Sequence, residues 1–261
     1  MIEAIIFDLD GTLVQTELLK ARSHALATLE LSPVPLTEEQ VIAASQDLYG
    51  TSDHLTALIL IERFSLQDSI QARLAQWGMQ TPWEAFLKLQ RGIYMDMVAD
   101  RQALRQRGIA DTLAVLDAVR RDGFRVALAT MSFRDQAETV LDALGLAHAF
   151  ELVVTAEDVQ EGKPDPEIYR LVAQRLGLSS QQCLVIEDTL VGVQSAVAAG
   201  MWCIAVPTYL TRDEVHGGHV LDERWILDDP AALQGALEEM LQERMVEDGV
   251  RGAVVEQGVG A

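Results

Sequence analysis

Residues 1–14 read MIEAIIFDLDGTLV, and in this stretch an apolar run ends abruptly in two acids one residue apart. Residues 4–7 are continuously apolar and rich in residues that favour strands, which is typical of a parallel strand covered on both faces. Gly11 marks the turn that follows. Because ligands of open parallel sheets bind beyond the carboxyl ends of the strands, Asp8 and Asp10 lie where chemistry is expected. A polar loop with one capping acid would explain only one of the two.

Beyond residue 125 the sequence alternates between short apolar runs and helical patterns. The runs cover 125–130, 152–155, 183–187 and 202–206, with a weaker candidate at 225–227. Four of the helical patterns end at a glycine, as helices commonly do at their C-termini: Gly123, Gly145, Gly177 and Gly200. Strands that alternate with helices imply right-handed crossovers and a parallel sheet covered by helices.

Residues 16–97 have a different character, with helical apolar spacing and no convincing strand. Thr37, Asp53 and Thr81 mark candidate helix starts. A connection of this length without structure is uncommon in a compact domain, so we predict an inserted helical subdomain. The expected division is a core of residues 1–15 and 98–246, a cap of residues 16–97, and a disordered tail of residues 247–261.

Composition excludes several classes of protein. The chain has 261 residues, 49% of them hydrophobic, which suffices for one large domain or two modest ones. Its formal net charge of −20 argues against nucleic-acid binding and opposes anionic substrates, so a phosphate site must bring its own cations. With no apolar stretch long enough to span a bilayer and no signal peptide before the first strand, we expect a cytoplasmic protein without membrane association. Cys183 and Cys203 lie in apolar runs and are expected to be free thiols.

Further polar groups follow two of the later predicted strands. Thr130 and Ser132 end the second apolar run, and Glu187 and Asp188 end the fourth. Alone, each pair would be assigned to a turn or a helix cap. Because the carboxyl ends of parallel strands meet at one edge of the sheet, we expect these groups to gather beside the opening acids.

A lysine joins this set from a loop that the sequence defines well. In EGKPDPEIY, residues 161–169, Pro164 biases Lys163 toward an extended conformation. Asp165 is a candidate N-cap, with Pro166 at the first helical position. Lys163 is therefore expected in the loop just before a helix, although a lone lysine in a loop is usually only solvated.

The combined set suits phosphoryl transfer. Clustered carboxylates raise one another's pKa unless a cation neutralises them, and hard oxygen ligands suit magnesium, Mg²⁺. One carboxylate can then act as a nucleophile and another can exchange protons with a leaving group or water. Hydroxyls, backbone N–H groups and a lysine can hold phosphoryl oxygens. The chemistry indicated is transfer through an aspartyl-phosphate.

At this point the sequence resembles the haloacid dehalogenase superfamily of phosphohydrolases, in the branch with a helical cap inserted after the first strand. The resemblance rests on DLDGT at 8–12, the hydroxyl-ended strand at Thr130, the loop at Lys163 and the acidic pair at 187–188, in that order. It covers residues 1–228. It implies an α/β fold with a Rossmann-like parallel-sheet core and an inserted all-helical cap.

The resemblance also implies roles for the acids. Asp8 is the nucleophile, and Asp10 is the general acid/base. Asp8, the backbone carbonyl of Asp10 and Asp188 hold Mg²⁺. Glu187 is either a further ligand or lies behind the ligands.

It implies roles for the phosphate-binding groups in the same way. Thr130 and the backbone that follows it at Met131 bind the phosphoryl group. Lys163 stabilises the charge on the nucleophile and the phosphate. The substrate is expected to be a small-molecule phosphate ester, and the oligomeric state stays open.

The cap is expected to select the substrate. Its loop at 47–54, DLYGTSDH, contains Tyr49, Gly50 and Thr51 but no basic residue, whereas similar sugar phosphomutases carry a cation there for a second phosphate. Lys20 stands where many relatives have a histidine. Three alternatives stay open for it: it changes how cap closure reaches Asp10, it offers a cation to an anionic substrate when the cap closes, or it is a solvated helix residue.

An acid at position 10 favours a phosphatase or a phosphomutase, since dehalogenases of the family lack it. The function predicted is a Mg²⁺-dependent phosphatase that hydrolyses a small phosphorylated metabolite, with a preference for monophosphates of hydroxylated molecules. Two alternatives remain: a beta-phosphoglucomutase-like enzyme, and a phosphoaspartate signalling or non-catalytic phosphate-binding module.

Overall fold

The computed structural model of the chain describes residues 1–258, with side chains described through residue 246. Its centre is a five-stranded sheet in the order β3-β2-β1-β4-β5, in which every neighbouring pair is parallel. The strands are β1 (Ala4–Phe7), β2 (Arg125–Ala129), β3 (Leu152–Val154), β4 (Cys183–Glu187) and β5 (Trp202–Ala205). The α/β fold with a parallel sheet is thereby confirmed. The weaker candidate run contributes only an isolated bridge between Ile226 and Ala205.

Helices cover both faces of the sheet because side chains alternate along the strands. On one face Ile5 and Phe7 pack against α8 (Ala110–Arg121), α9 (Arg134–Leu144) and the start of α13 (Leu233–Gly258). On the other face Ala4 and Ile6 pack against α10 (Glu167–Leu176) and α11 (Leu190–Ala198). The continuous apolar run of β1 is therefore buried on two sides.

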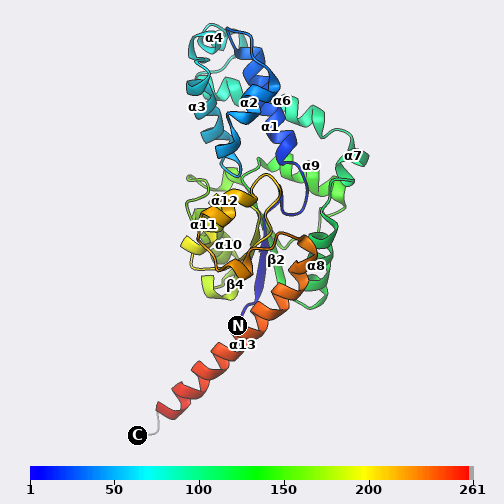
Figure 1. Cartoon of the computed structure of the whole chain (residues 1–261), viewed down its shortest axis with the longest axis vertical. Helices are drawn as coiled ribbons and strands as arrows, with labels where there is room; N and C mark the ends of the chain where they lie inside the picture. Colours follow the sequence, from blue (N-terminus) through cyan, green and yellow to red (C-terminus); the bar gives the residue numbers. More distant parts are fainter. Residues whose placement is uncertain (259–261) are drawn as a thin grey trace.

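The segment between β1 and α7 (Arg101–Arg105) is helical in the structure. It contains α1 (Glu17–Leu31), α2 (Glu38–Ala43), η1 (Gln46–Leu48), α3 (Asp53–Arg63), α4 (Gln67–Gln71), α5 (Leu74–Trp77) and α6 (Pro82–Met97). These helices share a hydrophobic cluster of their own, which includes Leu31, Leu60 and Phe86. Figure 1 shows them as a separate layer at the end of the molecule toward which β1 runs. We propose that they form the inserted cap, residues 16–97, and use that name below.

Local sequence explains where the cap helices begin. Thr37 and Thr81 each form a capping box with the residue three positions later, and Pro82 occupies the first turn of α6. Ser52 caps α3 by accepting from the Leu55 N–H, so Asp53 is its first helical residue.

The remaining elements are short. They are α12 (Arg212–Gly217), η2 (Ala156–Asp158), η3 (Ser180–Gln182), η4 (Glu223–Trp225) and η5 (Pro230–Ala232). No helix in the described part of the chain is both long enough and apolar enough to cross a membrane.

The C-terminal segment differs from its expected lack of structure. Helix α13 continues to Gly258 and projects from the body of the molecule (Figure 1), whereas the sequence predicted disorder from residue 247. Leu233, Leu237 and Met240 anchor its first turns in the core, and an established helix adds further turns at little cost. The predicted tail's last residues, 259–261, lie outside those described.

Candidate active site

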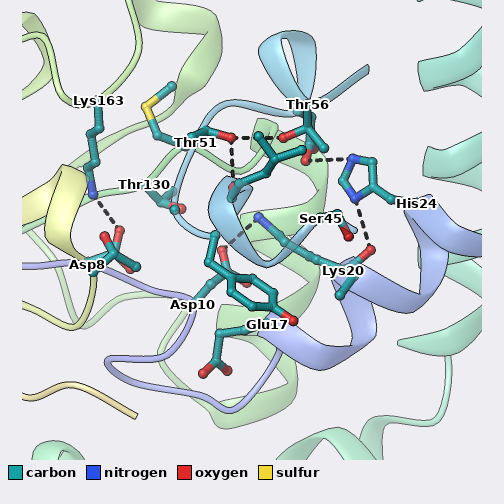
Figure 2. A pocket seen from close by; sticks show the side chains of 17 residues that line it. Asp8, Asp10, Glu17, Lys20, His24, Ser45, Thr51, Thr56, Thr130 and Lys163 are labelled. Atoms are coloured by element: carbon teal, nitrogen blue, oxygen red, sulfur yellow. Dashed lines mark hydrogen bonds and ion pairs between the residues drawn. The ribbon is translucent and has the colours of Figure 1, made fainter. Parts of the chain in front are cut away.

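A pocket lies between the carboxyl edge of the sheet and the cap, and it collects most of the residues singled out in the sequence. The core contributes Asp8, Asp10, Thr130, Met131, Lys163 and Thr189. The cap contributes Glu17, Lys20, Ala21, His24, Ser45, Leu48, Tyr49, Gly50, Thr51, Asp53 and Thr56. Figure 2 shows Asp8 and Lys163 on one side of this pocket and Lys20, His24 and Ser45 on the other. Residues far apart in the sequence thus meet at the edge predicted for them.

Asp8 and Lys163 form a buried ion pair at the core side of the pocket. Lys163 Nζ donates to Asp8 Oδ1 at 2.7 Å and to Glu187 Oε1 at 2.5 Å. Burial would lower the pKa of Lys163, but the two carboxylates raise it, so the ammonium stays charged. Burial raises the pKa of Asp8 to about 7, against the opposing effect of Lys163. A further cation near Asp8 would favour its ionised, nucleophilic form.

Asp10 is held by three donors from different parts of the chain. Thr16 Oγ1 donates to Oδ1 at 2.5 Å, Ser132 Oγ donates to Oδ2 at 2.5 Å, and Lys20 Nζ lies 2.9 Å from Oδ2. Burial works to raise the pKa of Asp10, but Lys20 and the two hydroxyls together lower it. These three donors hold the Asp10 side chain in place and favour its carboxylate form.

Asp188 directly follows β4, and its carboxylate lacks a full set of hydrogen-bond partners. Its Oδ1 accepts from Thr12 Oγ1 at 3.2 Å, whereas the buried Oδ2 has no hydrogen-bond partner. Burial and the neighbouring acids Glu187, Asp8 and Glu17 raise its pKa well above the ordinary value. A β-carbon on Gly11 would come within 2.0 Å of Asp188 Oδ2, so only glycine allows this close approach.

These features fit a hard divalent cation. The Asp188 Oδ2 atom is buried without a hydrogen-bond partner, and the pKa values of Asp8 and Asp188 are raised. A bound Mg²⁺ would coordinate the free oxygen and stabilise the ionised form of both acids. Among the described residues, no three side chains of His, Cys, Asp or Glu converge as a metal site. The ligand set implied by the family resemblance needs only two carboxylates, those of Asp8 and Asp188, because it includes the backbone carbonyl of Asp10 as a third ligand.

Both carboxylate oxygens of Glu187 are occupied by protein donors. Its Oε1 accepts from Lys163 Nζ and, at 2.8 Å, from Tyr169 OH. Its Oε2 accepts from the backbone N–H groups of Asp188 and Thr189 and from the Thr189 hydroxyl. Because five protein donors occupy both oxygens, the geometry favours the alternative in which Glu187 lies behind the ligands and holds Lys163.

Thr130 and Met131 line the pocket at the end of β2, as predicted for phosphate-binding groups. Thr130 Oγ1 accepts from the Ser132 N–H at 3.1 Å, which shapes the turn that delivers Ser132 to Asp10.

Lys20 reaches Asp10, in agreement with the alternative in which this cap residue acts on the core acid. Its side chain is only 17% exposed, which excludes the solvated position. Its ammonium contacts Asp10 and donates to Ser132 Oγ at 2.6 Å, so it joins the cap to the core at this carboxylate.

The cap loop reaches the core at Gly50. Its φ is +77°, and a β-carbon there would lie 2.6 Å from Thr189 Oγ1, so the loop packs directly on the end of β4. Thr51 Oγ1 donates to the Leu48 carbonyl and pairs with Thr56 Oγ1 at 2.9 Å. Tyr49 also lines the pocket.

Sequence reasoning missed several pocket residues, chiefly on the cap: Glu17, His24, Ser45, Asp53, Thr56 and Thr189. One signal was available, because Glu17, Lys20 and His24 recur at spacings of three and four and so share a face of α1. The others come from separate segments whose meeting no local pattern predicts.

Comparisons with known proteins agree with this architecture. Residues 2–200 match the family model described as haloacid dehalogenase-like hydrolase. The chain is 31% identical over 212 residues to fructose-1-phosphate phosphatase YqaB of Escherichia coli strain K12, covering 77% of this chain and 95% of that protein. It is 31% identical over 204 residues to a phosphoglycolate phosphatase of Shigella boydii serotype 4, covering 76% and 79%.

The solved structures show the same fold. The crystal structure of beta-phosphoglucomutase from Clostridium difficile superposes with a TM-score of 0.76 at 20% identity, covering 94% of this chain and all of that one. The match to the family model spans strands β1 to β4, the proposed cap and every motif that carries the resemblance. This chain therefore belongs to the haloacid dehalogenase-like hydrolases.

Proposed function

We propose that this protein is a Mg²⁺-dependent phosphatase that hydrolyses a small phosphorylated metabolite through an aspartyl-phosphate. The observation that carries the proposal is the pairing of two differently held carboxylates at one pocket wall. Asp8 is bound to Lys163 through Oδ1, which leaves Oδ2 for attack. Asp10 is fixed next to it by Lys20, Ser132 and Thr16.

In the first half-reaction, Asp8 attacks phosphorus and the bond to the leaving oxygen breaks. Asp10, when protonated, gives its proton to that oxygen. Lys163 and the groups at Thr130 and Met131 hold the phosphoryl oxygens as their charge develops. Mg²⁺, when held by Asp8, Asp188 and the Asp10 carbonyl, supplies charge neutralisation.

In the second half-reaction, Asp10 as a carboxylate takes a proton from water, which attacks phosphorus. The bond between phosphorus and Asp8 breaks, which releases phosphate and regenerates the nucleophile. The donors around Asp10 lower its pKa, so they favour the base form needed in this step.

The cations of the pocket favour a phosphatase over a sugar phosphomutase. Among the lining residues, all of which the structure describes, the only lysines or arginines are Lys20 and Lys163. Both are already paired with carboxylates. A second phosphate would therefore find no free cation in the pocket.

Release of phosphate from p-nitrophenyl phosphate with and without Mg²⁺ tests the proposal. We expect repeated, Mg²⁺-dependent turnover by the wild type and its loss in Asp8→Asn, because an amide is a poor nucleophile of nearly the same shape. Asp111→Asn, an exposed acid on α8, serves as the matched control. Release of a single equivalent of p-nitrophenol, with the phosphoryl group retained on the protein and no phosphate released, would indicate the signalling module. Activity of Asp8→Asn within tenfold of wild type would refute Asp8 as the nucleophile.

A further inference from the structure

The cap wall of the pocket carries a histidine and an aspartate that the mechanism does not use. His24 Nε2 lies 3.5 Å from Asp53 Oδ1, and each residue is 5% exposed. Both line the pocket, and Figure 2 shows His24 on the side opposite Asp8 and Lys163. The pair therefore faces the alcohol portion of a phosphate ester, which departs as the leaving group.

The hydrogen bonds of His24 determine which of its nitrogens carries hydrogen. Nδ1 lies 3.0 Å from the Lys20 carbonyl oxygen, and a carbonyl can only accept, so Nδ1 is the donor. Burial, the largest effect, lowers the pKa of His24, which keeps the ring neutral near pH 7. Nε2 is then an acceptor that faces a carboxylate, another acceptor.

Neither acceptor is satisfied by the protein. His24 Nε2 and Asp53 Oδ2 are both buried without a hydrogen-bond partner. Buried polar atoms are rarely left in this state unless a water, an ion or a ligand completes them. Two neighbouring acceptors need one kind of partner, a group that donates hydrogen bonds.

The place of Asp53 in its helix does not explain this arrangement. An acid is favourable in the first turn of α3 because of the helix dipole. That role needs no burial against a histidine, and Ser52 already caps the helix. Exposed Asp68 shows the ordinary form of such an acid in the first turn of α4.

The surrounding side chains favour a hydroxyl over an anion. Ser45, Thr51 and Thr56 line the same end of the pocket, and hydroxyls can exchange donor and acceptor roles with a polyol. Glu17 adds another buried acid, while both lysines of the pocket are paired elsewhere. A second phosphate or a carboxylate would meet negative charge here.

We propose that His24 and Asp53 form a subsite that binds a hydroxyl of the alcohol portion of the substrate, so that the enzyme selects monophosphates of polyols. The subsite disfavours esters that carry a second phosphate or a carboxylate. This inference rests on the proposed phosphatase function.

The test compares kcat/KM for fructose 1-phosphate, fructose 1,6-bisphosphate, phosphoglycolate and p-nitrophenyl phosphate in wild type, Asp53→Asn and Asp68→Asn. We expect wild type to prefer fructose 1-phosphate to the bisphosphate and to phosphoglycolate. Asp53→Asn should lower kcat/KM for fructose 1-phosphate by about 10- to 100-fold, the value of a hydrogen bond to a charged group. It should raise kcat/KM for the bisphosphate, and Asp68→Asn should leave all four values unchanged.

Opposite changes for two substrates separate this subsite from a structural role, which would affect both alike. His24→Phe, whose ring can keep its place beside Phe86, provides a second variant and should also lower kcat/KM for fructose 1-phosphate more than for p-nitrophenyl phosphate. Equal effects on every substrate, or a wild-type preference for the bisphosphate or phosphoglycolate, would overturn the subsite.

A binding experiment keeps this inference separate from the proposed function. Absence of turnover with p-nitrophenyl phosphate would refute the phosphatase proposal but not the subsite. Calorimetric titration of Asp8→Asn with fructose 1-phosphate, with and without Asp53→Asn, measures the subsite without chemistry. We expect the second substitution to weaken binding about tenfold or more, and equal affinities would refute the subsite even in an active enzyme.

Discussion

Replacing Glu187 by glutamine should destabilise the protein while leaving its Mg²⁺ requirement unchanged. The carboxylate is fully buried and accepts from five donors, two on Oε1 and three on Oε2. An amide has only one acceptor oxygen. Whichever way the glutamine turns, its NH₂ group faces at least two donors that have lost their acceptor.

The size of the effect follows from that geometry. Each buried donor left without a partner costs about 1–3 kcal/mol, and breaking one side of a buried ion pair costs about 3–5 kcal/mol. Lys163 keeps Asp8 as a partner at 2.7 Å, so we expect the lower part of that range, about 3 kcal/mol. For a chain of this size the melting temperature should fall by about 10 °C.

Thermal unfolding without Mg²⁺ measures the stability, and a Mg²⁺ titration of activity measures the metal requirement. Tyr169→Phe, which removes one of the five donors and leaves the carboxylate, should cost only about 1 kcal/mol. A fall in melting temperature of less than about 2 °C for Glu187→Gln would refute the reasoning. A large increase in the Mg²⁺ requirement would show instead that Glu187 is a metal ligand.

Three further predictions test other parts of the site and the surface. Asp188→Ala should raise the Mg²⁺ concentration for half-maximal activity by at least about tenfold, since it removes one of few protein ligands; an unchanged titration would exclude it as a ligand. Lys20→Met should lower kcat by about tenfold for every substrate alike. It should also move the acid limb of the pH profile to higher pH, because the ammonium helps to lower the pKa of Asp10. A loss confined to polar substrates would indicate that Lys20 binds the substrate directly. His216 hydrogen-bonds to Asp228 and Glu223, which raise its pKa, so its stabilisation is complete below the unfolded pKa and is lost as pH rises through the folded value. His216→Gln should therefore lower the melting temperature more at pH 6 than at pH 9, and the loss in the free energy of unfolding should not exceed about 1 kcal/mol. Equal losses at both pH values would contradict this.

Short-range patterns were enough to predict the sheet and one edge of the site. Continuous apolar runs determine which strands are buried on both faces, and glycines and capping residues determine where helices begin and end. Once the sheet is parallel, Asp8, Thr130 and Asp188 must lie at the same edge, because every strand ends there. The order of the motifs along the chain therefore carried most of the information about the core.

The cap could not be predicted in the same way, because its contacts with the core join distant segments. Lys20 and Ser132 are 112 positions apart, and no local pattern shows that this lysine pairs with the core carboxylate at Asp10. The meeting of His24 with Asp53 depends likewise on how α1 packs beside α3. Sequence alone determined which groups are available for phosphoryl transfer. The tertiary structure decided which of them neutralise one another and which, like Asp188 Oδ2 and the His24–Asp53 pair, remain unsatisfied, because burial and pairing depend on packing between separate elements.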